Sequence, residues 1–167
     1  MFDIVTAEDF HLKLRADFDD LLKEPHSTRL ALNCIITAYH LHEWVWGDWL
    51  KKDRALRKSL GVKDKKSFLD FIVRASPWFS AIRDLTNGTK HFVRNAGFAT
   101  MRVGGYGQGP YGIGPFGEPY LLIDYGEGAA EHRWKTAIEL IEVVVRFWAE
   151  FFDRYHPTAA KVGGWKF

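Results

Sequence analysis

Cysteine is nearly absent from this chain, and its scarcity narrows the classes of protein to consider. Among 167 residues the single cysteine is Cys34, which lies inside an apolar run. A lone cysteine cannot close an intramolecular disulfide, and Cys34 has no neighbouring cysteine with which to form a CxxC metal site. We therefore expect a buried, inert thiol, and the composition favours a reducing compartment such as the cytoplasm.

Long hydrophobic runs are missing as well. No apolar stretch reaches the ~20 residues that a membrane-spanning helix needs. The first ten residues, MFDIVTAEDF, carry acids where a secretory signal peptide would carry basic residues. We expect a soluble protein with no membrane partner.

Several standard catalytic motifs are also absent. The chain contains no GxSxG elbow, no HExxH zinc helix and no pair of ExxH motifs for a di-iron bundle. Residues 104–119, GGYGQGPYGIGPFGEP, are rich in glycine but lack the Lys-Ser/Thr ending of a phosphate-binding loop. These absences exclude the common hydrolase, zinc-protease and nucleotide-binding signatures.

The chain does have enough apolar residues for one ordinary domain. Hydrophobic residues make up 47% of the sequence, so residues 1–167 are predicted to form a single domain with its own core. The net charge is only +2, yet bases far outnumber acids over residues 51–94, while the two ends are acidic. A basic middle could attract a polyanion such as RNA, pair with acidic ends of the same or a second copy, or form a solvated linker.

The hydrophobic pattern predicts a mainly α-helical fold, an up-and-down bundle of four or five helices. Apolar residues recur at helical spacing over 7–23, from 28 to about 50, over 68–75, from 77 onward, and from Ala130 to Tyr155. Residues 98–103 and 120–125 are instead rich in β-branched and aromatic residues and bounded by glycines, which predicts a β-hairpin. The hairpin, about residues 97–126, would be inserted before the last long helix.

The hairpin loop has an internal repeat, Gly-Pro-Tyr-Gly followed by Gly-Pro-Phe-Gly. Its aromatic residues Tyr106, Tyr111 and Phe116 could stack on nucleobases or cover a pocket. The alternative interpretation is a plain hairpin tip built from turn-forming residues.

Most of the polar side chains that could take part in catalysis or binding lie in residues 77–94, PWFSAIRDLTNGTKHFVR. On a continuous helix Asp84, Asn87 and His91 share one stripe, with Arg83 and Lys90 beside it. Asn-Gly is also a common helix ending, in which case Lys90 and His91 would lie in a loop. We predict that the helix continues, because a glycine inside a helix costs only ~1 kcal/mol relative to alanine.

The second predicted helix carries His40 and Glu43 at a spacing of three residues, on one side. In the functional interpretation they point toward Asp84 and His91 on a neighbouring helix and form a polar pocket inside the bundle. The alternative is that His40 is an ordinary structural histidine. His42 lies ~200° from His40 on a helix, so these two histidines cannot share a site.

An arginine, a polar residue and a histidine on one helix of an α-helical bundle resemble the HEPN superfamily (higher eukaryotes and prokaryotes nucleotide-binding). The resemblance implies a metal-independent ribonuclease of the toxin or phage-defence type, without cofactors, acting as a homodimer. It assigns phosphate stabilisation to Arg83, the polar-partner role to Asp84, and acid or base catalysis to His91. The family places four to six residues between arginine and histidine, whereas seven intervene here, and a π-bulge at Asn87 and Gly88 would restore the phase.

Two other classes of function remain open from the sequence. His40, Glu43, Asp84 and His91 could supply the ligands of a metal or small-molecule pocket, with Asn87 and Lys90 as further contacts. Alternatively, the tryptophans and the Gly-Pro-aromatic hairpin could form the binding face of a non-catalytic interaction protein. The abundance of large aromatics also predicts self-association, most simply as a homodimer.

Overall fold

The structure is a computed structural model. It describes residues 3–91, 99–104, 108–127 and 133–156, without the side chains of 89–91 and 99–102. Its elements, in chain order, are α1 (Ala7–Lys23), α2 (Thr28–Val45), the π-helical turn η1 (Trp46–Leu50), α3 (Arg54–Leu60), α4 (Lys65–Ala75), α5 (Phe79–His91), β1 (Ala99–Val103), β2 (Tyr120–Asp124), β3 (Trp134–Thr136) and α6 (Ala137–Tyr155).

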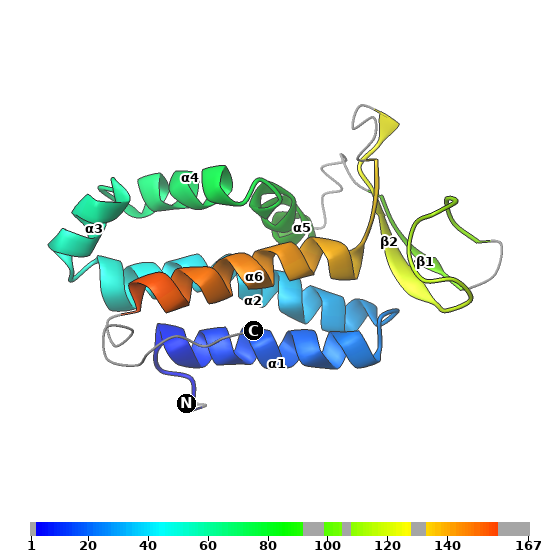
Figure 1. The fold of residues 1–167 in the computed structure, drawn as a ribbon, viewed down its shortest axis with the longest axis horizontal. Coiled ribbons are helices and arrows are strands. Elements are labelled where there is room, and N and C mark those ends of the chain that lie inside the picture. Colours follow the sequence, from blue (N-terminus) through cyan, green and yellow to red (C-terminus); the bar gives the residue numbers. More distant parts are fainter. Residues whose placement is uncertain (1–2, 92–98, 105–107, 128–132, 157–167) are drawn as a thin grey trace.

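Helix α2 lies at the centre of the bundle, where it packs against α1, α5 and α6 (Figure 1). The short helices α3 and α4 follow at one end of the molecule, and the sheet projects from the other end. The prediction of a mainly helical bundle with a hairpin before the last helix is confirmed. The described residues form six α-helices rather than four or five, because the basic segment after η1 contains the separate helix α3. None of the described helices is both long enough and apolar enough to cross a membrane.

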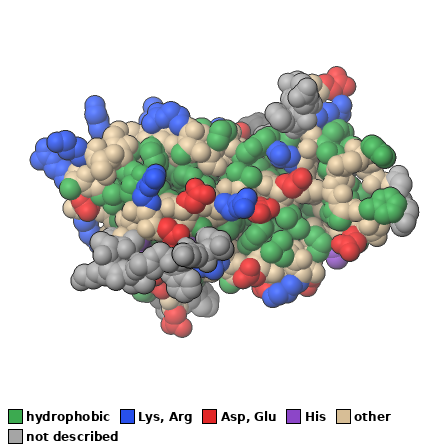
Figure 2. All heavy atoms as spheres, in the orientation of Figure 1, with side chains coloured by type: hydrophobic (Ala, Val, Ile, Leu, Met, Phe, Trp, Pro, Cys, Tyr) green, Lys and Arg blue, Asp and Glu red, His purple; other side chains and the backbone are tan. Residues whose placement is uncertain are grey.

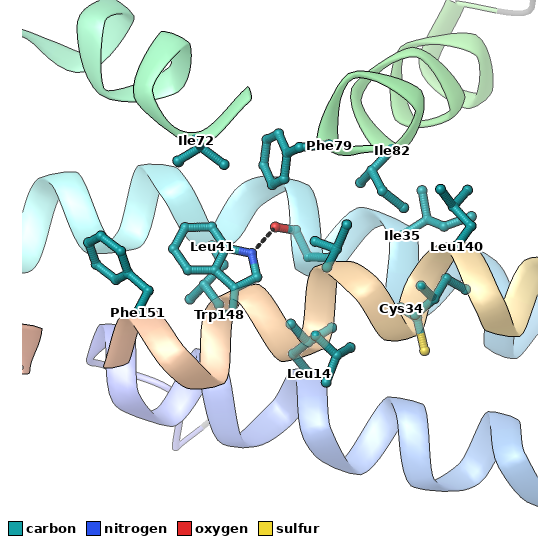
Figure 3. Packing of buried hydrophobic residues seen from close by; sticks show 14 of the residues in the cluster. Leu14, Cys34, Ile35, Leu41, Ile72, Phe79, Ile82, Leu140, Trp148 and Phe151 are labelled. Carbon is teal, nitrogen blue, oxygen red and sulfur yellow. Dashed lines mark hydrogen bonds between the residues drawn. The ribbon is translucent and has the colours of Figure 1, made fainter. Parts of the chain in front are cut away.

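The core lies between the long helices, and Trp148 of α6 is its largest fully buried side chain. The indole Nε1 of Trp148 donates a hydrogen bond of 3.0 Å to the carbonyl oxygen of Ala38, which joins α6 to α2 (Figure 3). Five of the helices contribute fully or largely buried side chains around this contact: Leu14, Cys34, Ile35, Leu41, Ile72, Phe79, Ile82, Leu140 and Phe151. Cys34 is buried as predicted, and burial raises the pKa of its thiol to about 12.

Capping residues fix where the first and last helices, α1 and α6, begin. Thr6 caps α1 in a reciprocal arrangement, since its hydroxyl accepts from the backbone N–H of Asp9 and the Asp9 carboxylate accepts from the N–H of Thr6. Thr136 and Glu139 form the same capping box at the start of α6. The apolar stripe predicted a start near Ala130, but the structure begins α6 at residue 137.

The region before α6 is a third strand rather than the first turns of the helix. Residues Trp134–Thr136 form β3, which pairs antiparallel with β2, so that Asp124 lies opposite Trp134. The Arg133 guanidinium binds the Asp124 carboxylate at 3.0 Å and strengthens this pairing. The predicted hairpin itself is confirmed as the antiparallel pair β1 and β2, with Val103 opposite Tyr120.

The described part of the hairpin loop folds back over Tyr120. The Tyr120 hydroxyl donates to the carbonyl oxygen of Ile113 at 2.7 Å, and the ring lies against Gly114. Tyr111 and Phe116 are exposed, and Tyr106 lies outside the described residues. The positive φ angles of the loop glycines explain why the repeat uses glycine at both ends of each unit.

Candidate functional site

Helix α5 runs without interruption through Asn87 and Gly88 to His91, so the predicted continuation of the helix is confirmed. Packing explains why the Asn-Gly pair does not end it. Ile82 is fully buried and Thr86 is 5% exposed. The Thr86 hydroxyl donates back to the carbonyl oxygen of Ile82 at 2.8 Å. Burial of this face holds the helix together at a position where the sequence alone also allows a break.

The opposite face of α5 carries the predicted polar residues. Asp84 and Asn87 are both exposed, as their spacing of three residues predicts for one side of a helix. The Arg83 Nε donates to an Asp84 carboxylate oxygen at 2.9 Å. This hydrogen bond raises the pKa of Arg83 above its usual value, while partial desolvation opposes the shift. The Arg83 guanidinium is therefore permanently charged and positioned at the surface.

The expected π-bulge at Asn87 and Gly88 is not present, because α5 is α-helical along its whole length. On a regular helix the eight-residue step from Arg83 to His91 corresponds to ~80° around the axis. The side chains of Lys90 and His91 lie outside the described residues, so the predicted pocket around His91 stays a prediction. The π-helical turn of this protein lies instead at Trp46–Leu50, immediately after α2.

His40 and Glu43 of α2 form a second polar group, together with Lys65 of α4. The His40 Nδ1 lies 3.2 Å from one Glu43 carboxylate oxygen, and the Lys65 ammonium donates to the other at 2.8 Å. Hydrogen bonding from Lys65 lowers the pKa of Glu43, partial burial opposes this, and His40 lowers it further. Glu43 is therefore ionised at neutral pH, with both carboxylate oxygens in use.

The polar group of His40, Glu43 and Lys65 and the pair of Arg83 and Asp84 form separate hydrogen-bond networks. Among the described side chains, no hydrogen bond or ion pair joins the His40–Glu43 group to Arg83 or Asp84. Helices α2 and α5 do pack against each other, and Tyr39 contacts Phe79 with ring centroids 6.0 Å apart. Glu43 thus binds α4 through Lys65, a residue that the sequence pattern did not single out, while His40 contacts Glu43 within α2. The basic run around Lys65 was visible, but its long-range pairing with Glu43 was not.

His42 lies beneath this surface and is structural. It is 2% exposed, and its Nδ1 donates to the Tyr39 carbonyl oxygen, which fixes that nitrogen as the protonated one. Burial lowers the pKa of His42, although the hydrogen bond to Tyr39 opposes the shift. The prediction that His40 and His42 do not share a site agrees with this placement, since His40 is 40% exposed and bound to Glu43.

An open pocket of about 400 Å³ lies beside the π-helical turn, where the sequence did not predict a site. Its lining residues come from the segment before α1, the end of α2, η1 and the turn after η1: Val5, Glu43, Trp44, Gly47, Asp48 and Lys52. The Asp48 carboxylate also accepts from the backbone N–H of Ala7 at 3.1 Å and so ties η1 to α1. Of the predicted site residues with described side chains, Glu43 borders this pocket.

The described residues contain no group of three or more His, Cys, Asp or Glu side chains placed to hold a metal ion. Comparison of the whole chain with protein-family models, with curated proteins and with solved structures gives no match in any of the three. The function is therefore inferred from the residues of α5 and from the surface around them.

Proposed function

We propose that the chain is an RNA-binding, metal-independent endoribonuclease of the HEPN-like type, acting in the cytoplasm as a homodimer. The observation that supports this most is the unbroken helix α5, which carries Arg83, Asp84, Asn87 and His91 on one rigid element. A break at Gly88 would have separated the arginine from the histidine. Continuity keeps both residues within three helical turns.

Arg83 has the properties of a phosphate-binding group. Its side chain is 38% exposed, and its Nε is held by Asp84 at 2.9 Å. This contact leaves the two terminal nitrogens to donate to a phosphate, in the forked geometry that suits phosphoryl oxygens. Asp84 acts as a positioning residue, while Asn87 and Lys90 supply further contacts to the ribose and phosphate.

The reaction is transesterification within the RNA strand. The ribose 2′-hydroxyl attacks the adjacent phosphorus, the bond from phosphorus to the 5′-oxygen breaks, and a 2′,3′-cyclic phosphate and a 5′-hydroxyl form. His91 accepts the proton of the 2′-hydroxyl, water protonates the departing 5′-oxygen, and the hydroxide so formed takes the proton back from His91, which restores its neutral form. Arg83 balances the charge that develops on the phosphoryl oxygens.

The test is cleavage of a generic RNA in the presence of a chelator, with DNA of the same sequence as a substrate that lacks the 2′-hydroxyl. His91→Ala and Arg83→Ala should each lower the cleavage rate by about 10²- to 10⁴-fold and leave the melting temperature within a few degrees. Arg146→Ala is a matched control, because Arg146 is 75% exposed on α6 and lies 3.9 Å from Glu142. This control should cleave like the wild type.

Three outcomes would contradict the proposal: no cleavage by the wild type, cleavage that the chelator abolishes, or full activity of His91→Ala. Bound metal detected by elemental analysis would instead favour the alternative function, a metal pocket of His40, Glu43, Asp84 and His91.

Self-association is supported by exposed apolar side chains on three helices, including Leu12, Leu22, Ile36 and Val143. A monomeric mass by light scattering at physiological salt would contradict the homodimer.

A further inference from the structure

One end of the molecule carries a concentrated positive charge. Residues 51–66, KKDRALRKSLGVKDKK, contain eight Lys and Arg residues and two Asp residues, a net charge of +6. Figure 2 shows Lys and Arg side chains gathered over the end of the molecule where α3 and α4 lie. Seven of the eight are exposed, and one of these seven, Lys65, binds Glu43. The other six form what we name the basic surface: Lys51, Lys52, Arg54, Lys58, Lys63 and Lys66.

The two acids in this segment serve to cap helices rather than to pair with its lysines. Asp53 accepts from the backbone N–H of Leu56 at 2.9 Å, which begins α3. Asp64 accepts from the N–H of Ser67 at 2.7 Å, which begins α4. Of the basic surface, Lys52 has an acidic neighbour within 4.0 Å among the described residues, at the long distance of 3.9 Å.

The basic surface is also held in a fixed shape. Arg57, between the exposed residues, donates to the carbonyl oxygens of Leu50 and Lys51 at 2.9 and 2.8 Å. These bonds tie α3 to the end of η1. Gly61 ends α3 in the left-handed conformation with φ 67°, so that the chain turns directly into α4. The charges therefore do not belong to a solvated linker, which was one of the interpretations of the sequence.

The partner must be recognised through charge, because the surface offers little else. The described residues include seven large exposed hydrophobic side chains, and none of them lies between residues 51 and 75. Insertion into a membrane interface and a protein–protein contact both need apolar or aromatic anchors. Binding to a sugar-phosphate backbone does not, since counterion release supplies the affinity.

We infer that the basic surface, which runs from the end of η1 over α3 to the first turn of α4, is a docking surface for the phosphate backbone of RNA, bound without regard to base sequence. This inference rests on the proposed function and names how its substrate is held. Helix α4 leads from the basic surface to α5, against which it packs. Arg74 is exposed in the last turn of α4, ~12 Å along the helix from Lys66, but the exposed Asp70 lies between them, so the continuous basic surface ends at the first turn of α4.

The test measures binding of a fluorescently labelled RNA by anisotropy between 50 and ~300 mM salt. The triple variant Lys58→Gln, Lys63→Gln, Lys66→Gln removes three charges from the basic surface. The control triple Lys23→Gln, Arg29→Gln, Arg146→Gln removes three exposed charges from α1, α2 and α6. Both variants have the same net charge, so a general loss of positive charge would weaken RNA binding equally in the two.

We expect the basic-surface triple to bind RNA on the order of ten- to a hundredfold more weakly at 0.1 M salt, with the slope of log affinity against log salt reduced by about 2. The control triple should bind like the wild type, and RNAs of different sequence but equal length should bind equally. Equal weakening of both triples would overturn the inference, as would tighter binding of the wild type to vesicles containing phosphatidylserine.

The docking surface and the catalytic proposal can fail separately. RNA binding that the basic-surface triple loses, in a protein that cleaves nothing, would support the docking surface and contradict the ribonuclease. Cleavage with an unchanged KM in the basic-surface triple would overturn the docking surface and leave the ribonuclease in place. Melting temperatures of both triples check that neither variant is unfolded.

Discussion

His11 of α1 makes the stability of this protein sensitive to acid. Its side chain is 7% exposed and stacks on Phe152 of α6, with ring centroids 4.2 Å apart. Among the described atoms its Nε2 has no hydrogen-bond partner. Burial lowers the pKa of His11 from 6.5 to about 4, and electrostatic interactions with Arg15 and His156 act in the same direction. The imidazole is therefore neutral in the folded protein at pH 7.

The sign of the pH effect follows from this lowered pKa. The unfolded chain binds a proton at His11 near pH 6.5, whereas the folded protein binds it only near pH 4. The contribution of neutral His11 to the free energy of unfolding is present in full above pH 6.5 and is lost as the pH falls toward 4. At 1.36 kcal/mol per pH unit, the difference corresponds to about 3 kcal/mol. That loss is a large part of the ~5–15 kcal/mol by which an ordinary domain is stable.

The variant His11→Phe removes the titrating group and keeps an aromatic ring against Phe152. We expect its free energy of unfolding at pH 7.5 to lie within about 1.5 kcal/mol of the wild type, since the ring is only slightly larger. Between pH 7.5 and 4.5 it should lose about 2–3 kcal/mol less than the wild type does. Urea unfolding followed by tryptophan fluorescence at four pH values measures both quantities.

Leu12→Phe is the control, because it places an aromatic ring at an exposed position of the same helix and removes no titrating group. Its curve of stability against pH should run parallel to that of the wild type. If His11→Phe and the wild type lost the same free energy between pH 7.5 and 4.5, the assignment of a buried neutral imidazole to His11 would be wrong.

Two further predictions test the packing. Trp148→Phe should lower the free energy of unfolding by about 2–3 kcal/mol, because it removes the hydrogen bond to Ala38 and leaves a cavity; a loss below 1 kcal/mol in urea would contradict this. Gly114→Ala should destabilise the protein by about 1–3 kcal/mol more than Gly112→Ala does. Both glycines have a positive φ, but only at Gly114 would the new Cβ lie 2.6 Å from the Tyr120 ring. Equal melting temperatures for the two glycine variants would refute the proposed contact.

Local patterns in the sequence determine most of the helical architecture. The bounds of α1 agree with the predicted range 7–23, since the Thr6 cap and the apolar spacing both involve only neighbouring residues. The strands β1 and β2 lie within the predicted ranges, because glycine-bounded segments of β-branched and aromatic residues have few other solutions. Gly61 likewise ends α3 in a left-handed conformation, which glycine adopts more readily than other residues.

Contacts between distant residues decided the remainder. The apolar stripe extended the last helix back over Trp134, but pairing with β2 makes that segment a strand. Asn87 and Gly88 allowed either a break or a helix, and burial of Ile82 against the bundle selected the helix.

The candidate site divides in the same way. The spacing of Asp84 and Asn87 placed them on one exposed side of α5, because helical geometry is local. Which partners the polar side chains take was not local. Glu43 binds Lys65, 22 residues further along the chain, and only the packing of α4 against α2 brings the two together. The spacing of residues in the sequence determines which side of a helix each residue lies on. Which side chain of another helix it contacts depends on how the helices pack in three dimensions.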